Sequence, residues 1–258
     1  MRLKSLREEV LDANLELARR GLVLYTFGNA SGIAREEGCV IIKPSGVPYE
    51  TMKAEDLVVV DLEGKIVEGD LRPSSDLPTH LVLYKAFPAI GGIAHTHSRA
   101  ATSWAQAQRE IPCFGSTHAD YFEGPVPVTR SLSPAEIRKD YERNTGLSIV
   151  RCLGKRKLLH TPGVLVAGHA PFCWGQTVAE AAHNAVVLEE IAAMALQAIT
   201  ANPKVRPISK ALHQKHFSRK HGTSAYYGQE RTSLSSNYHK SDSDKEEPIE
   251  GSDAFWLE

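Results

Sequence analysis

Short apolar runs of strand length alternate with helical periodicity along most of this chain of 258 residues. Apolar side chains at three- and four-residue steps predict a helix over residues 3–17, which Gly21 ends. Apolar runs predict strands over residues 39–43, 57–61 and 66–67, the last two joined by a turn at Glu63-Gly64. We therefore predict an α/β fold of three layers, in which helices cover both faces of a central, mostly antiparallel sheet.

The same alternation continues towards residue 200. Two capping-box sequences, at residues 133–136 and 177–180, predict helix starts, and the second helix runs to about Thr200. We also predict a helix that begins after Ser74-Ser75 and includes residues 80–87, and a second helix over residues 99–108. A strand is predicted to enter at Gly91 and end in His95-Thr96-His97, and two more strands are predicted over residues 164–168 and 172–174.

The chain changes character after Gln229. Residues 230–258 hold eight acidic and three basic residues, many serines and little periodicity. Low hydrophobicity combined with net charge is typical of disorder, because such a segment cannot offset the entropy lost on folding. We predict one domain over residues 1–229 and a disordered acidic, serine-rich tail over residues 230–258. An apolar cluster at residues 254–257 leaves docking of the tail end as an alternative.

Composition excludes several classes of protein. A net charge of -1 and a pI near 6.8 argue against a general nucleic-acid binder and against a polybasic membrane-surface protein. We see no apolar run near the ~18 residues of a membrane span, and no signal-peptide core near the N-terminus. The four cysteines form no CxxC pair, which favours reduced thiols in a cytoplasmic protein.

The segment His95-Thr96-His97 is the sharpest indication of chemistry. Residues two apart on a strand project from the same face, so the two imidazoles are placed to converge on one cation. A zinc site needs a third protein ligand, for which His169 is the best candidate, and Asp76 is a plausible fourth. The competing histidines are His80, His118 and His183. The alternative interpretation is that His95 and His97 hydrogen-bond loop carbonyls.

Three segments have the composition of an anion site. Residues 28–32 and 43–46 combine glycine with hydroxyl or amide donors, and Ser74-Ser75 stands at a predicted helix start. Each alone is typical of an ordinary turn, but together they favour a small phosphorylated ligand. Asp120 lies in the polar cluster 116–121, where it is either a general acid or base or a turn residue that accepts backbone hydrogen bonds.

Taken together, these residues resemble the class II aldolase/adducin-head superfamily and, within it, the L-ribulose-5-phosphate 4-epimerases. The resemblance covers the chain from the first helix to Gln229 and is specific. It rests on the motifs at residues 26–29, 42–46, 73–76, 92–98, 117–122, 162–166, 183–185 and 220–229.

The resemblance implies a class II aldolase-like fold and a zinc isomerase that interconverts L-ribulose 5-phosphate and D-xylulose 5-phosphate without a redox cofactor. The implied route is retro-aldol cleavage of the C3–C4 bond followed by re-addition. It also implies a cytoplasmic homotetramer with one Zn²⁺ per subunit and sites at the subunit interfaces. The implied metal residues are His95, His97, His169 and Asp76; the substrate residues are Gly28, Asn29, Ser45, Gly46, Ser74 and Ser75; the acid/base pair is Asp120 and Tyr227.

The resemblance leaves alternatives. A class II sugar-phosphate aldolase of the fuculose- or rhamnulose-phosphate type typically has Glu where this chain has Asp76. An adducin-head-like scaffold is expected to have lost the histidines, which are all present here. Phe27 stands where Trp is common, a departure that removes no implied ligand. The sequence leaves open zinc against manganese or cobalt, and arabinose against ascorbate catabolism.

Overall fold

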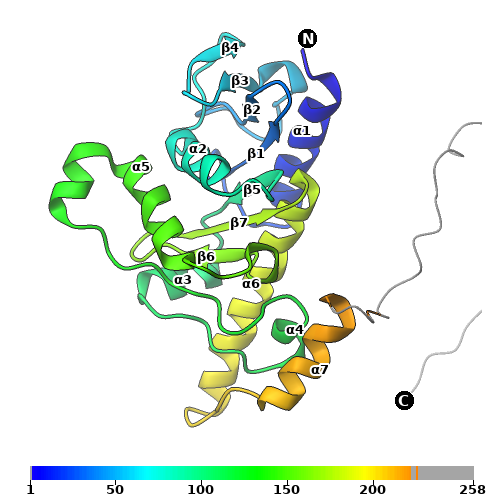
Figure 1. Cartoon of the computed structure of the whole chain (residues 1–258), viewed down its shortest axis with the longest axis vertical. Coiled ribbons are helices and arrows are strands. Elements are labelled where there is room, and N and C mark those ends of the chain that lie inside the picture. The colour runs from blue at the N-terminus through cyan, green and yellow to red at the C-terminus, as the bar shows by residue number, and fades with distance from the viewer. Residues whose placement is uncertain (1, 222–224, 226–258) are drawn as a thin grey trace, which may run out of the picture. The chain divides into compact units, whose positions relative to one another are not determined.

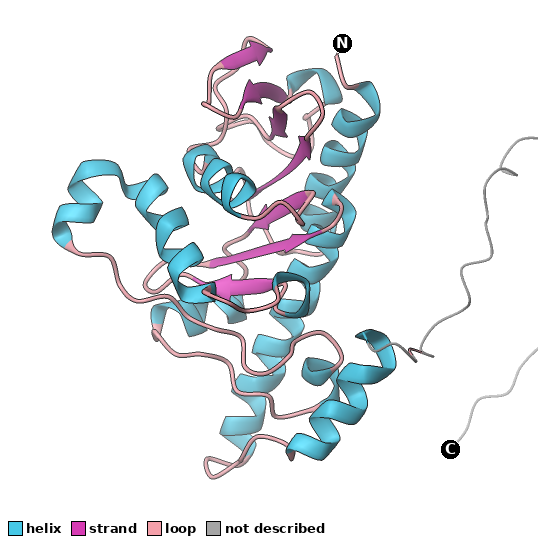
Figure 2. Ribbon diagram, viewed as in Figure 1, coloured by secondary structure: helices cyan, strands magenta, loops and turns pink. Residues whose placement is uncertain are grey.

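The computed structural model describes residues 2–221 and 225. Over these residues it contains one sheet of seven strands in the order β4-β3-β2-β1-β5-β7-β6, and all the strand pairings are antiparallel (Figures 1 and 2). The strands are β1 (Asn29–Ala34), β2 (Cys39–Ile42), β3 (Val58–Asp61), β4 (Ile66–Glu68), β5 (Gly92–His95), β6 (Gly163–Leu165) and β7 (Pro171–Gly175).

Helices cover both faces of this sheet, as predicted. On one face, α1, α3 and α6 share a buried core with sheet residues such as Ile41 and Ala94. On the other face, α2 and α5 pack on sheet residues such as Ile42 and Phe172. The helices are α1 (Lys4–Arg19), α2 (Leu77–Ala86), α3 (Arg99–Gln106), α4 (Ser116–Ala119), α5 (Pro134–Leu153), α6 (Val178–Ala201) and α7 (Lys210–His221), with short 3-10 turns at Ala54–Asp56 and Leu158–His160.

The predicted strands agree with β2, β3 and β4 to within one residue, but the sequence did not predict β1. We took residues 28–32 for a turn, whereas Asn29–Ala34 forms the strand between β2 and β5. The strand predicted to end at His97 ends at His95 instead. Asn29, the first residue of β1, pairs with His95, and Gly28 turns away with a φ of 71°. Beyond His95 the strand therefore has no partner on that side.

A row of three glycines crosses β1, β5 and β7 beneath the first turn of α6. Gly32 pairs with Gly92, and Gly92 pairs with Gly175. A Cβ atom on Gly32 would lie 2.6 Å from Cγ2 of Val178, and one on Gly92 would lie 2.4 Å from its Cα. A Cβ on Gly175 would lie 2.6 Å from that of Glu180. The start of α6 thus rests on sheet backbone, which only glycine permits.

The capping signals give mixed results. Ser133 and Glu136 form the complete reciprocal box at the start of α5. At the start of α6, Thr177 Oγ1 accepts from the N–H of Glu180, but the Glu180 carboxylate accepts from the N–H of Gln176 rather than from Thr177. The helix start is therefore where we predicted it, with the second half of the box moved by one residue.

Helix α6 corrects one expectation from composition. Among the described residues it is long and apolar enough to span a membrane by length and hydropathy alone. Yet Leu188, Ile191 and Ala195 on this helix are buried in the core against the sheet and α1. Its apolar character therefore fits a core helix. The four cysteines are free, as predicted from the absence of a CxxC pair.

Candidate active site

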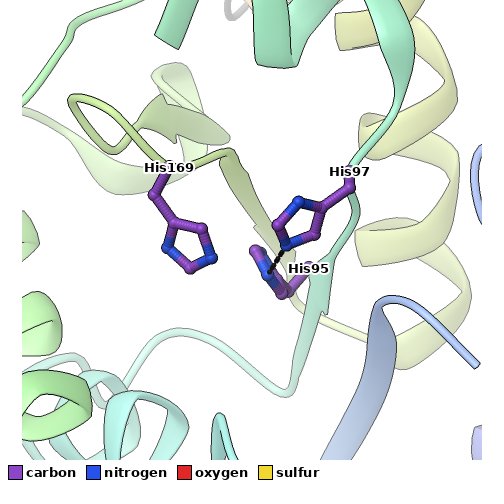
Figure 3. Close-up of side chains that lie close together, drawn as sticks. All are labelled: His95, His97 and His169. Carbon is purple, nitrogen blue, oxygen red and sulfur yellow. Dashed lines mark hydrogen bonds between the residues drawn. The ribbon is translucent and has the colours of Figure 1, made fainter. Parts of the chain in front are cut away.

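Three histidines from two strand ends converge on one point (Figure 3). His95 is the last residue of β5, His97 follows two residues later, and His169 lies in the turn between β6 and β7. One ring nitrogen from each lies within 4.8 Å of the others, and the Nε2 atoms of His95 and His97 are 3.2 Å apart. The structure therefore brings together the three histidines that we selected as metal ligands.

The surroundings of these rings fit a metal ion. His95 Nδ1 lies 2.9 Å from the carbonyl oxygen of Pro171, which only accepts, so Nδ1 carries the proton and Nε2 presents a lone pair to the cluster. The ring of Phe172 stacks on His95 with the centroids 4.1 Å apart and fixes its orientation. His169 Nδ1 is buried and has no hydrogen-bond partner among the described residues. An orphaned buried nitrogen of this kind is expected where a ligand belongs.

The histidines are also in the protonation state that a metal requires. Burial lowers the pKa of His169 to about 4, and the neighbouring His95 and His97 contribute to this lowering. Burial and the His95 ring likewise lower the pKa of His97. Both rings are therefore neutral at pH 7, and neutral imidazole binds divalent transition ions. Three imidazole nitrogens on one side of a site are a donor set found in catalytic zinc sites.

Asp76 lies beside the three rings. Its Oδ2 atom is 3.9 Å from His95 Nε2 and accepts a hydrogen bond of 2.8 Å from Asn29 Nδ2. Burial raises the pKa of this carboxyl group, but His95, His80, His169 and the Asn29 amide together lower it by more, so its pKa lies below the usual value. Asp76 is therefore an ionised oxygen donor next to the imidazoles, which fits the role of fourth ligand or close neighbour.

A pocket of about 460 Å³ opens beside these residues. Its wall contains residues of all three segments with anion-site composition and two of the three clustered histidines, His97 and His169. Asn29 lies behind this wall, where its amide group also donates to Ser74 Oγ. The lining residues are Thr26, Phe27, Gly28, Lys43, Pro44, Ser45, Gly46, Ser74, Ser75, Asp76, His97, Tyr141, Glu142 and His169.

The sequence led to no assigned role for six of the lining residues, of which Lys43, Tyr141 and Glu142 matter most for the chemistry. Lys43 is buried, and burial lowers the pKa of its amine to about 8. We quoted it within an anion segment without assigning it a role. Tyr141 and Glu142 come from α5, where the backbone of Asp140 leaves the helical conformation. The signal for that break is slight, since it consists of a single Asp inside a helical pattern.

Asp120 lies elsewhere in the chain. At the end of α4 its carboxylate accepts hydrogen bonds from His216 Nδ1 (3.1 Å) and Arg219 Nε (2.9 Å), both on α7. Burial raises its pKa, but Arg219 and then His216 lower it by more, so the group is ionised. Within the described part of one chain, Asp120 is not among the residues that line the histidine pocket. Tyr227 lies outside the described residues.

The competing histidines lie outside the cluster. His80 is fully buried behind it and bonds through Nδ1 to Ser31 Oγ at 2.7 Å. His118 donates from Nε2 to the carbonyl oxygen of Gly124, and His183 lies beside the Tyr121 hydroxyl group. All three side chains thus have structural contacts of their own. Nε2 of His80 and Nδ1 of His118 are also buried without a hydrogen-bond partner among the described residues, but neither belongs to the cluster of three ring nitrogens.

This fold and this histidine site define a known class of protein. The chain belongs to the family described as Class II Aldolase and Adducin N-terminal domain, whose model matches residues 8–196. Over 227 residues it is 56% identical to proteins named L-ribulose-5-phosphate 4-epimerase UlaF from Salmonella paratyphi C (strain RKS4594) and from Salmonella typhi. Each match covers 88% of this chain and 100% of the relative.

Solved structures confirm the predicted fold. An L-fuculose 1-phosphate aldolase superimposes with a TM-score of 0.72 at 24% identity, covering 85% of this chain and 97% of the other. The L-fuculose-1-phosphate aldolase of Thermus thermophilus gives a TM-score of 0.61 at 24% identity and covers 77% and 97%. At this level of identity the likeness concerns the fold alone.

Proposed function

We propose that this protein is an L-ribulose-5-phosphate 4-epimerase, which interconverts L-ribulose 5-phosphate and D-xylulose 5-phosphate. The observation that carries the proposal is one pocket in which His97, His169 and Asp76 adjoin three glycine and hydroxyl segments. The 56% identity to epimerases over their whole length supports this choice over an aldolase. The presence of all three histidines argues against a scaffold without chemistry.

The three histidines and Asp76 would hold one divalent cation per subunit, which we propose to be zinc. When bound, it supplies Lewis-acid stabilisation of the negative charge that develops on the C1–C3 fragment. His95 keeps its Nε2 lone pair directed at that position through its bond to Pro171. Asn29 holds Asp76 in place from behind.

The phosphate group of the substrate fits the opposite part of the pocket wall. Ser45, Ser74 and Ser75 offer hydroxyl groups, and Gly46 and Ser75 offer backbone N–H groups, since the N–H groups of Ser45 and Ser74 already donate to carbonyl oxygens. Ser74 and Ser75 come just before α2, where the helix dipole favours an anion. Lys43 adds a positive charge, because an amine with a pKa of about 8 is mostly protonated at pH 7. This clamp keeps the C4–C5 fragment in the site after the C3–C4 bond breaks.

Inversion at C4 needs proton transfer on both faces of the aldehyde. In cleavage the C4 hydroxyl group loses its proton and the C3–C4 electron pair stays on C3. In re-addition that pair attacks the other face of the aldehyde, and the C4 oxygen regains a proton. We propose Asp120 and Tyr227 for these two roles. Since Asp120 is not among the residues that line the pocket of its own chain, we propose that both serve a neighbouring subunit in a homotetramer.

Reduced thiols and a balanced charge support a cytoplasmic location. Sugar-phosphate catabolism, with arabinose or ascorbate as the source, is the proposed context. Residues 230–258, which we propose to be a disordered tail beyond the single domain, lie outside the described residues.

The proposal is tested by incubating the metal-loaded protein with L-ribulose 5-phosphate and following two products in the same sample. We expect D-xylulose 5-phosphate without net release of glycolaldehyde phosphate. Accumulation of glycolaldehyde phosphate as the main product would instead identify an aldolase. Formation of neither product would overturn the proposed substrate.

A further inference from the structure

Helix α5 is interrupted beside the pocket, and the interruption is built into the structure. Asp140 has φ -169° and ψ 82°, which is extended backbone within the helix. The Asn144 amide donates to the carbonyl oxygen of Glu136 (2.8 Å), and Thr79 Oγ1 donates to that of Glu142 (2.6 Å). The Asp140 carboxylate accepts from the N–H of Arg143 (3.4 Å), as a helix N-cap does. Two polar groups released by the break, the carbonyl oxygen of Glu136 and the N–H of Arg143, thus have partners, and the Thr79 contact ties the segment after the break to α2.

The break places Tyr141 in the wall of the pocket. Its ring centroid is 6.0 Å from that of His169, and Phe27 lies 6.3 Å from His97. Among the described lining residues these are the two carbocyclic aromatic side chains, and the others are small, polar or proline. Phe27 is 52% exposed, whereas Tyr141 is partly buried. Tyr141 is therefore the more enclosed of the two rings beside the metal ligands.

Tyr141 also carries a phenol hydroxyl group, which can donate and accept hydrogen bonds.

The pocket is larger than the two-carbon fragment that the proposed reaction must retain. About 460 Å³ lies in the range of sites that enclose drug-sized ligands, far more than a two-carbon aldehyde phosphate fills. The proposed reaction requires this fragment to turn its aldehyde over without leaving. The phosphate clamp holds only one end of the fragment, so its free end needs a boundary.

Building on the proposed function, we infer that Tyr141 is a substrate-contacting residue whose ring confines the aldehyde end of the cleaved fragment beside His169. This role predicts that Tyr141 sets how often cleavage ends in re-addition rather than in escape. Its hydroxyl group adds a hydrogen bond to the bound sugar phosphate.

The first test measures the ratio of glycolaldehyde phosphate released to D-xylulose 5-phosphate formed from L-ribulose 5-phosphate. We expect Tyr141→Ala to raise this ratio about 10-fold, which corresponds to ~1.4 kcal/mol of lost confinement. Tyr141→Phe keeps the ring and should leave the ratio near that of the wild type, with KM raised a few-fold. The control Ile137→Ala removes an exposed side chain (49%) from the same helix before the break and should change neither quantity. An unchanged ratio in Tyr141→Ala would overturn the inference.

The second test is independent of turnover. Titration calorimetry with glycolaldehyde phosphate measures its affinity for the wild type and for the same variants. We expect about 10-fold weaker binding to Tyr141→Ala and a smaller loss in Tyr141→Phe. If the wild type binds the fragment in a Tyr141-dependent way but forms no D-xylulose 5-phosphate, the proposed function fails and Tyr141 keeps its role. If epimerisation is observed but Tyr141→Ala binds the fragment as the wild type does, the inference on Tyr141 fails alone.

Discussion

Asn29 and His95 lie directly opposite each other in β1 and β5, and the Asn29 amide group donates to Asp76. The register of these two strands therefore fixes the position of a metal-site histidine relative to the side chain that holds the neighbouring carboxylate. A shift of one residue in either strand would turn its side chain to the opposite face of the sheet from the other. The site thus depends on strand pairing as well as on the loops that line the pocket.

Replacing His97 with alanine tests the metal site. The change removes one of three imidazole donors. Loss of a residue that only hydrogen-bonds a metal ligand typically lowers metal affinity roughly 10- to 100-fold, so we expect a larger fall when the ligand itself is removed. Metal content by mass spectrometry and epimerase turnover should fall together. His183→Ala, which alters a histidine outside the cluster, is the control and should retain its metal. A fully active His97→Ala protein without metal would refute the assignment.

Replacing Asp120 with asparagine tests the proposed acid/base role. Loss of the carboxylate should lower kcat by about 10²- to 10⁴-fold, the usual contribution of general acid–base catalysis, while metal content stays at the wild-type level. The change also weakens contacts to His216 and Arg219, so thermal unfolding must be measured alongside. Glu123→Gln, which loses the nearby ion pair with His160, controls for local destabilisation. Wild-type turnover in Asp120→Asn would remove Asp120 from the mechanism.

Buried neutral histidines should make the metal-free protein sensitive to mild acid. Burial lowers the pKa of His118 from 6.5 to about 4 and that of His80 to about 3. Between about pH 6.5 and pH 4 the unfolded chain binds protons that the folded chain does not. The free energy of unfolding should therefore fall as the pH is lowered across this window, by up to about 1.4 kcal/mol per pH unit for each such histidine.

Urea denaturation at several pH values measures this dependence. His118→Gln keeps a neutral donor for the carbonyl group of Gly124 and should reduce the slope by about the contribution of one proton. A slope that is unchanged by this substitution would contradict the pKa shift of His118.

The acidic tail is expected to be dispensable for folding and catalysis. Deleting residues 230–258 removes a segment whose composition is typical of disorder, so the rate and the oligomeric state should remain those of the full chain. Light scattering coupled to size-exclusion chromatography measures the oligomer. Collapse of the oligomer on deletion would show that the tail contributes to assembly.

The elements predicted well from sequence are those whose own side chains are apolar and regularly spaced. Strands β2 and β3 are built mainly of Val and Ile, and the helix starts at Ser133 and Thr177 carry explicit capping signals. Strand β1 has the sequence Asn-Ala-Ser-Gly-Ile-Ala, which contains few strand-type side chains. This strand is buried because other elements cover it, and it has few large apolar side chains of its own, so hydrophobic periodicity does not reveal it.

The residues of the site also fall into those that the sequence reveals and those that it does not. Histidine spacing and a proline-marked turn suffice to select His95, His97 and His169, because their chemistry is visible in the residue type. Tyr141 acquires its place in the pocket wall from a local break at Asp140, and a single Asp inside a helical pattern is too slight a signal to predict such a break. Asp120 was selected from its polar cluster, which gives no sign that it does not line the pocket within its own chain.

Replacing Gly92 with alanine tests the contact between α6 and the sheet. The new Cβ atom would lie 2.4 Å from the Cα of Val178, so backbone must move, and we expect a loss of about 3 kcal/mol in the free energy of unfolding. Gly115→Ala is the matched control, because nothing lies within 4 Å of its added Cβ and its φ is -152°. This control should change stability by no more than about 0.5 kcal/mol. Equal stabilities for the two variants would disprove the close approach.

The glycine row also determines which parts of this active site are open to evolutionary change. Where Gly92 meets the start of α6, the spacing between helix and sheet is set by main-chain atoms of Thr177 and Val178, so an exchange of side chains on the helix cannot adjust it. His95 lies at the other end of the same short strand, β5, so this contact also restricts where His95 can lie. New substrate preferences in such a protein are therefore expected to arise from the pocket-lining loops and the interrupted helix, while the metal-binding histidines keep the same place on the sheet.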